Sequence, residues 1–179
     1  MPRTNALKLV RDAHIDLETR VDDDHHQALK LWLRLLTCTN KIETDIRSKL
    51  RTDFDTTLPR FDLMAQLERN PDGLKMNQLS QRLMVTGGNV TGITDQLEKE
   101  GLVVRKPDPN DRRINSVTLT PAGRRSFHKM ARAHEQWVVH LFAGLTANDK
   151  DQIYQILAKL KRHVSAMDDA LPGGQGSRN

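Results

Sequence analysis

Several features are scarce in this 179-residue chain. Cys38 is the single cysteine, so no disulfide can form within the chain, and a reducing cytoplasm is the natural setting. No apolar run approaches the roughly 20 residues of a membrane span. The N-terminus lacks the uninterrupted apolar core and the small-residue cleavage site of a secretory signal. These absences predict a cytoplasmic protein without membrane association.

Catalytic motifs are also missing. The chain contains no G-x-S-x-G, no P-loop and no His-x-x-Glu-His. His14, His25 and His26 come nearest to a metal site, but their spacing matches no tight ligand motif, and a polar first helical turn explains the last two. We therefore expect no catalytic residue, no metal, no cofactor and no enzyme.

Apolar and aromatic residues are modest in number. Hydrophobic residues make up 37% of the chain and aromatic residues 4%, which leaves a lone subunit with a thin core. Long helices that bury an apolar stripe against a partner subunit would remedy this. The charge is basic, with a formal net charge of +5 and a pI of about 9.6. Such a balance indicates a polyanionic partner only where the charge is concentrated.

Apolar residues recur at helical spacing through most of the chain and predict a mostly α-helical fold. Gly101 is expected to end one helix, and Thr120 and Thr146 to cap two others. The last helix is expected to bury Ile153, Ile156, Leu157, Leu160 and Val164. The expected helices cover about 24–53, 58 to the stop at Asn70, 76–84, the residues between Gly88 and Gly101, 121 to Gly144, and 147 to at least Val164.

The segment from 76 to 100 carries the clearest functional pattern. Two short helices are joined by a turn containing Val85-Thr86-Gly87-Gly88, which is typical of a helix-turn-helix. The second helix presents short polar side chains, or none, to a major groove about 12 Å wide. Gly87, Gly88 and Gly92 would let its backbone approach a duplex closely. An ordinary helical hairpin with solvated polar faces is the alternative.

The sequence LVVRKPDPNDRRINSVTLT at 102–120 predicts two strands joined by a basic tip. A β-hairpin directly after a recognition helix is a wing, and cations at its tip can reach phosphates or the minor groove. The cations are Arg105, Lys106, Arg112 and Arg113. Asp111 is expected to pair with one arginine, although an Asp-Arg sequence also favours a turn by itself.

Two segments resemble the MarR family of winged-helix repressors. DRRINSVTLTPAG is similar to that family's wing, and NQLSQRLMVTGGNVTGITDQLEKEGLVVR to its helix-turn-helix. The resemblance covers about 58–124 and implies a homodimer on a pseudo-palindromic operator in double-stranded DNA, with half-sites roughly 34–36 Å apart. Within the family, MVTGGNVTGITDQLEKEGLV is most similar to regulators of hydroxycinnamate and related aromatic-acid catabolism, some of which respond to acyl-CoA thioesters.

The predicted fold is therefore a winged helix-turn-helix with a two-stranded β wing and a helical dimerisation region. Residues 1–21 form a mobile arm, 22–57 and 121–169 the dimerisation helices, 58–120 the winged domain and 170–179 a disordered tail. Asn89 and Gln96 are expected to read bases, because an amide can bond adenine bidentately. All predicted DNA contacts are Asn77, Thr86, Gly88, Asn89, Thr91, Thr94, Gln96, Arg105, Arg112 and Arg113.

The resemblance also implies a small-molecule effector, either an aromatic carboxylate or an aromatic acyl-CoA, which releases the DNA from a repressor. It would lie between the dimerisation helices and the winged domain, where Arg60 can meet a carboxylate or phosphate. Core packing for Trp32 and a surface ion pair for Arg60 are the alternatives. The predicted lining is His25, Leu29, Trp32, Leu33, Leu36, Arg60, Phe61 and Met64.

Other functions stay open on the sequence. Cys38 would serve a redox-responsive regulator, and the histidines a metal-responsive one. A winged helix can also act as an adaptor that binds protein and never DNA. Repression and activation need the same DNA-bound dimer, and we predict a repressor.

Overall fold

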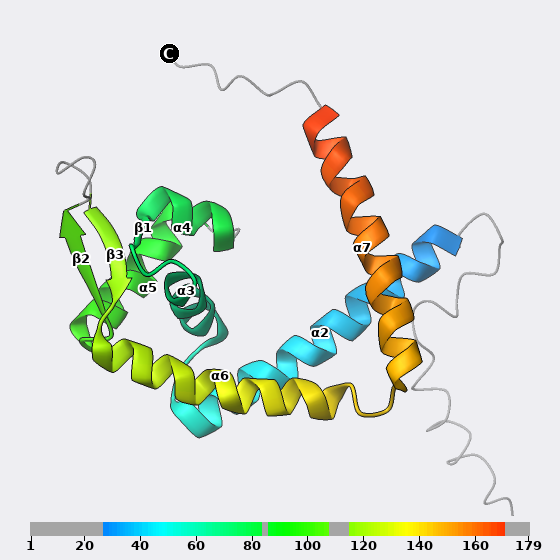
Figure 1. Ribbon diagram of the computed structural model, residues 1–179, viewed down its shortest axis with the longest axis horizontal. Helices are drawn as coiled ribbons and strands as arrows, with labels where there is room; N and C mark the ends of the chain where they lie inside the picture. Colours follow the sequence, from blue (N-terminus) through cyan, green and yellow to red (C-terminus); the bar gives the residue numbers. More distant parts are fainter. Residues whose placement is uncertain (1–26, 84–85, 108–114, 171–179) are drawn as a thin grey trace, which may run out of the picture. The chain divides into compact units, whose positions relative to one another are not determined.

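The computed structural model describes residues 27–83, 86–107 and 115–170 (Figure 1). The chain divides into two compact units, residues 1–135 and 136–179. The predicted arm 1–21, His25, Asp111, Arg112 and Arg113 lie outside the described residues.

The elements follow the predicted order and confirm a mostly α winged helix-turn-helix. Each predicted helix is present with its ends displaced by a few residues. The elements are α2 (Gln27–Phe54), α3 (Leu58–Glu68), β1 (Leu74–Lys75), α4 (Met76–Leu83), α5 (Gly87–Lys99), β2 (Val103–Pro107), β3 (Asn115–Leu119), α6 (Pro121–Leu141) and α7 (Ala147–Ala170).

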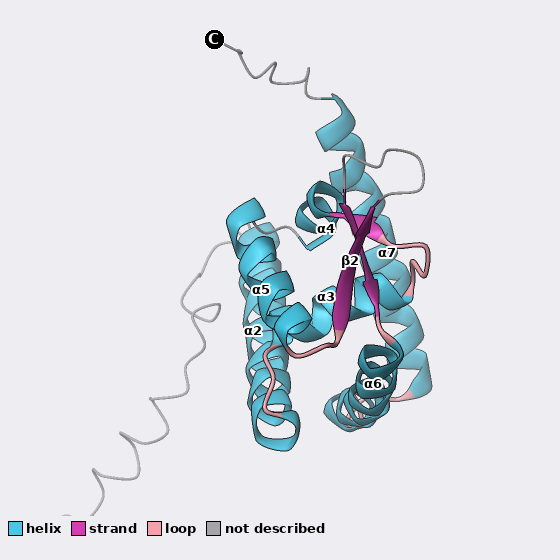
Figure 2. Cartoon of the chain, turned by 90° about the vertical axis from the view of Figure 1, so that its left-hand side faces the viewer, coloured by secondary structure: helices cyan, strands magenta, loops and turns pink. Residues whose placement is uncertain are grey.

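The sheet has one strand more than the predicted hairpin. Its order is β1-β3-β2 and all its pairs are antiparallel, with Val103 opposite Leu119 and Leu74 opposite Val117. Figure 2 shows the strands in magenta among the helices. Two residues are too few for an alternating pattern, so no periodicity indicated β1. The extra strand ties the chain before α4 to the wing.

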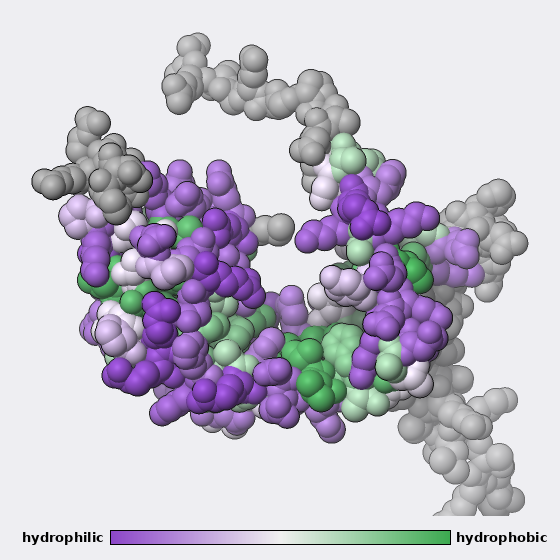
Figure 3. All heavy atoms as spheres, viewed as in Figure 1, coloured by the Kyte–Doolittle hydropathy of each residue, from purple (hydrophilic) through white to green (hydrophobic). Residues whose placement is uncertain are grey.

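Aliphatic side chains from helices and strands form the core of the first unit. Fully burying one leucine or valine contributes roughly 1.5–3 kcal/mol, so these positions dominate stability. Apolar atoms also reach the surface of the chain (Figure 3). The side chains with almost no exposed area include Leu50, Leu63, Met64, Leu67, Leu79, Val90, Leu97, Val103 and Val117.

The connection from α5 to the wing is fixed by backbone hydrogen bonds. Gly101 has a φ of 71°, its N–H donates to the carbonyl of Glu98, and the N–H of Leu102 donates to the carbonyl of Leu97. This pair of bonds is a Schellman motif, which ends a helix at a residue in the left-handed region, where glycine is favoured. The predicted helix end at Gly101 is confirmed.

The caps of the last two helices are also confirmed. The Thr120 hydroxyl accepts from the N–H of Gly123 at 3.0 Å, with Pro121 as the first residue of α6. Before α7, the Thr146 hydroxyl accepts from the N–H of Asp149 at 3.2 Å, and the Asp149 carboxylate accepts from the N–H of Thr146 at 2.9 Å. The Thr146 hydroxyl also donates to the Asp149 carboxylate at 2.6 Å, and this bond, together with the bond from the N–H of Thr146, lowers the pKa of Asp149.

The apolar stripe of α7 is exposed in the single chain, so its predicted burial is wrong for one subunit. Ile156 and Tyr154 are 63% and 71% exposed, and the rest of the stripe is exposed too. Helical spacing places apolar residues on one face but does not say what covers that face.

Among the described residues, no helix combines the length and apolarity needed to cross a bilayer.

Candidate nucleic-acid interface

The recognition helix α5 begins one residue after Thr86. Thr86 is the N-cap, with extended backbone angles of −65° and 150°, and its side chain makes no capping hydrogen bond. Gly87 and Gly88 were expected in the turn, but they form the first turn of the helix instead. The N–H groups of a first turn have no partner within the helix and favour a nearby anion.

One face of α5 is open. A Cβ added at Gly87, Gly88 or Gly92 would meet no atom of the chain within 4 Å. Asn89, Thr91 and Gln96 are exposed in the same helix, and the N-cap residue Thr86 is exposed before it. A helix with such a face can come close to the floor of a major groove, and its two amides can bond base edges.

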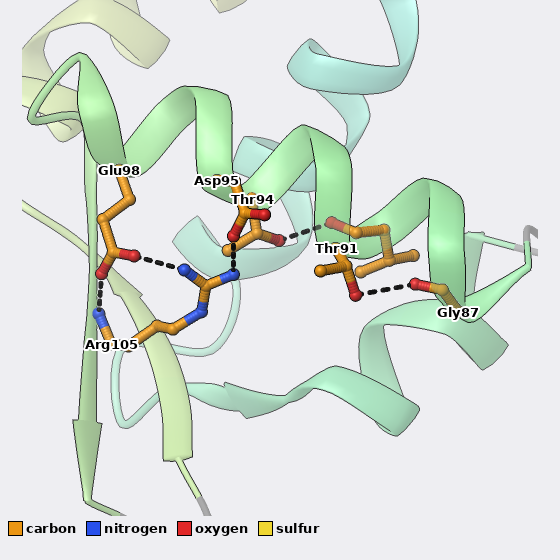
Figure 4. A network of polar contacts seen from close by, with 7 residues as sticks. Gly87, Thr91, Thr94, Asp95, Glu98 and Arg105 are labelled. Carbon is orange, nitrogen blue, oxygen red and sulfur yellow. Dashed lines mark hydrogen bonds and ion pairs between the residues drawn. The ribbon is translucent and has the colours of Figure 1, made fainter.

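Two threonines of α5 differ in their surroundings (Figure 4). Thr91 is exposed and its hydroxyl donates to the carbonyl of Gly87 at 2.9 Å. Thr94 is fully buried and its hydroxyl donates to the carbonyl of Val90 at 2.7 Å. The expectation that Thr94 lies on the outer face is therefore wrong. Thr94 lies four residues after Val90, so both point into the core.

Asn77 belongs to α4 rather than to the recognition helix. It is exposed, and its side-chain oxygen accepts from the N–H of Gln78 at 2.9 Å. Together with Lys75, Met76, Arg105 and Asn115 it lines a cavity of about 380 Å³ beside the sheet.

Arg105 does not point freely from the wing, as the sequence had suggested. Its backbone N–H donates to the Glu98 carboxylate at 2.9 Å, and its guanidinium pairs with Glu98 and with Asp95 (Figure 4). Burial opposes the positive charge, but the hydrogen bonds with Asp95 and Glu98 outweigh it and raise the pKa of Arg105. The arginine therefore joins β2 to α5. Sequence reasoning missed this, because Asp95 and Arg105 lie ten residues apart in different elements, with the turn at Gly101 between them.

Arg60 is likewise engaged, which corrects the expectation that its guanidinium is free to meet a ligand. It forms an ion pair with Glu100, and its Nε atom is buried without a hydrogen-bond partner. This pairing matches the alternative that the sequence left open. It connects the start of α3 with the end of α5.

The predicted effector residues are divided between two environments. On α2, Leu29, Trp32 and Leu36 are exposed, and Leu33 is half-buried. Met64 on α3 is 1% exposed and belongs to the core. The structure does not gather these side chains around one cavity.

Phe61, a member of the predicted set, lines a cavity of about 420 Å³ in the first unit. Its ring stacks on Phe127 with centroids 5.5 Å apart and lies 5.0 Å from the His134 ring. The sequence offered one signal for this cavity, because Phe61, Ala65 and Arg69 are spaced four apart and share a helix face. The full lining is Phe61, Asp62, Ala65, Gln66, Arg69, Arg82, Leu83, Phe127, Ala131 and His134.

Two titratable groups of this cavity are perturbed. Burial raises the pKa of Asp62, and Glu43 raises it further, against the effects of Arg47 and Arg69. Burial lowers the pKa of His134. Perturbed groups around a concave site with apolar walls are typical of a ligand pocket.

The metal-responsive and redox-responsive alternatives depend on histidine, cysteine and acidic side chains. No group of three histidine, cysteine, aspartate or glutamate side chains comes together within the ranges that the structure describes. Cys38 is a free thiol exposed on α2.

An open recognition helix followed at once by a hairpin in a small antiparallel sheet defines a winged helix-turn-helix protein. The model of the MarR family matches residues 56–114. A MarR family transcriptional regulator from Silicibacter pomeroyi is 34% identical to this chain, and its crystal structure matches 82% of this chain and 99% of that one with a TM-score of 0.66. This chain therefore belongs to the MarR family, whose members matched here are transcriptional regulators and not enzymes.

Two further comparisons agree. YkoM, an HTH-type transcriptional regulator of Bacillus subtilis (strain 168), is 35% identical over 89 residues, which are 50% of this chain and 58% of YkoM. The structure of the MarR mutant C80S from E. coli, complexed with operator DNA, matches 78% of this chain and 99% of that one, with a TM-score of 0.67 and 23% identity. At that identity the likeness supports the fold.

Proposed function

We propose that this regulator binds a pseudo-palindromic operator in double-stranded DNA as a homodimer and acts as a repressor. The observation that carries the proposal is the open face of α5, where Gly87, Gly88 and Gly92 leave room for a groove and Asn89 and Gln96 supply amides. The wing follows α5 within a few residues, and Lys106 on β2 is exposed, where a cation can reach a phosphate. The E. coli protein with this fold is complexed with operator DNA.

The homodimer rests on the exposed apolar face of α7. A contiguous apolar surface on a helix marks an interaction site, and two-fold symmetry lets the same face serve both subunits. Two recognition helices related in this way would read half-sites roughly 34–36 Å apart.

Duplexes selected from a random library test the DNA-binding part of the proposal. A preferred duplex should show an inverted repeat, and its affinity should fall by about 10³-fold or more between 50 and 200 mM salt if six or more phosphates are neutralised. A scrambled duplex of equal length is the control. Equal and weak binding of both duplexes would reject operator recognition and would favour the adaptor. A reporter behind the selected operator then tests repression.

The effector proposal uses the cavity between α3, α4 and α6. The Phe61 and Phe127 rings offer apolar walls for an aromatic acid, and the guanidinium groups of Arg69 and Arg82 offer partners for its carboxylate. A volume of about 420 Å³ suits a free acid. The cavity would hold only the acyl group of a CoA thioester, and the nucleotide would lie outside it.

A screen of hydroxycinnamates, benzoates and their CoA thioesters tests this choice by thermal shift and by operator release. Arg82→Gln should abolish the response while the apo variant still binds operator, because the carboxylate loses a charged partner. Arg125→Gln, an exposed arginine of α6 outside the cavity lining, is the matched control. A full response in Arg82→Gln would place the effector elsewhere, and release only by unrelated compounds would reject its class.

A further inference from the structure

A carboxylate lies on the very face of α5 that the proposed function turns toward DNA. Asp95 is 58% exposed and follows Thr91 by one helical turn. Phosphates repel such a charge, and the repulsion weakens binding to every sequence alike. The recognition helix therefore carries a cost that another residue has to offset.

Arg105 is placed to offset it. It comes from the middle of β2, where it pairs with Val117 of β3, and its side chain runs from the strand to α5 (Figure 4). The guanidinium pairs with Asp95 through Nη2 and with Glu98 through Nη1. With 24% of its side chain exposed, it is more buried than either carboxylate.

The two carboxylates depend on Arg105 differently. Glu98 also accepts from the backbone N–H of residue 105 at 2.9 Å, a bond that survives loss of the guanidinium. Among the described residues, Asp95 forms an ion pair with Arg105 and with no other side chain. Asp95, on the outward face of the helix, therefore depends more on the guanidinium for charge neutralisation than Glu98 does.

We propose that Arg105 is a positioning residue for DNA binding, which neutralises Asp95 on the DNA-facing surface and fastens the wing to the recognition helix without donating to a phosphate. The inference rests on the proposed DNA binding. It separates Arg105 from Lys106, whose side chain lies on the opposite side of the strand, since neighbours in a strand alternate.

A double-mutant cycle on operator affinity tests the assignment. Arg105→Gln should weaken binding by about tenfold, because Asp95 is left unpaired. Asp95→Asn should then restore more affinity in Arg105→Gln than it adds to the unmutated protein, with a coupling of about twofold to tenfold. If Arg105 instead released Asp95 and bound a phosphate, Asp95→Asn would help the unmutated protein at least as much as the variant. That sign of the coupling would overturn the proposal.

Lys106→Gln with Asp95→Asn is the matched control cycle, and its two effects should multiply independently. Thermal unfolding is measured for every variant, and Arg105→Lys replaces Arg105→Gln if the glutamine variant does not fold. A lysine keeps the charge but lacks the fork that spans both carboxylates, so the same sign of coupling is expected at smaller size. Failure of the unmutated protein to select any duplex would reject the proposed function itself, whereas the coupling is read only from proteins that bind.

Discussion

The backbone of Leu102 lies directly against Gly123: a Cβ on that glycine would be 1.9 Å from the carbonyl oxygen of Leu102. The same oxygen accepts from the N–H of Thr120 at 3.0 Å. The chain leaving α5 and the chain entering α6 therefore meet at a point where a side chain has no room. This contact sets where the wing begins relative to the helix that follows it.

Gly123→Ala should accordingly destabilise the protein by about 1–3 kcal/mol or more, because two backbone segments have to separate. Chemical denaturation measures the change. Gly144→Ala is the control, since a Cβ there meets nothing within 4 Å and the change should stay within about 0.5 kcal/mol. If the Gly123 variant is as stable as the unmutated protein, the backbone of Leu102 can shift away from residue 123 at little energetic cost.

Two substitutions at Gly92 should affect stability and DNA binding differently. Gly92→Ala adds a better helix former at an open position and should stabilise the fold by up to about 1 kcal/mol. Gly92→Leu should keep the fold but weaken operator binding by about tenfold or more, because its side chain would occupy the space of the groove. Thermal unfolding and fluorescence anisotropy read the two effects. If Gly92→Leu binds operator with undiminished affinity, this face of α5 does not contact the DNA.

Arg112→Ala should weaken operator binding by about 1–3 kcal/mol while the protein stays dimeric. The residue lies outside the described range, and the prediction rests on its place at the basic tip of the hairpin. Gel-shift titration measures the affinity, and sedimentation the mass. Unchanged affinity would contradict the assignment of the wing to the DNA interface.

Leu157→Asp should abolish self-association without unfolding the chain. Leu157 is 40% exposed on the apolar face of α7, so a charge costs little in one subunit but would be buried between two. Analytical ultracentrifugation at micromolar concentration should show half the mass. Gln155→Asp, at an exposed polar position of the same helix, should leave the mass unchanged. A dimeric Leu157 variant would assign the subunit contact to another surface.

Asp62→Asn should make stability less sensitive to pH. Burial and Glu43 raise the pKa of Asp62 above its ordinary 3.8 in the folded protein. The stability associated with its protonated form is complete below that ordinary value and is lost as the pH rises through the folded pKa. The variant should therefore unfold at a higher temperature than the unmutated protein at pH 7, with the difference shrinking in acid. A constant difference from pH 3 to 8 would contradict the perturbed carboxyl.

Much of the fold followed from local chemistry. The helical periodicity, the Gly101 terminus and the caps at Thr120 and Thr146 act over a few residues, and the structure confirms each of them. The strand β1 escaped prediction because two residues cannot display a period. Thr94 was misplaced because its small polar side chain gives no sign of the core that surrounds it.

The sequence by itself determined the order of the helices, the presence of the wing hairpin, and the helix boundaries at Gly101, Thr120 and Thr146, because propensities, caps and periodicities act between near neighbours. Only the tertiary structure decided that Arg105 and Arg60 are already paired with carboxylates and that Phe61, Arg69 and Arg82 surround one cavity. Ion pairs and cavities depend on distances between segments far apart in the chain, and composition does not encode those distances. The same reason explains why the apolar face of α7 was predictable while its exposure was not.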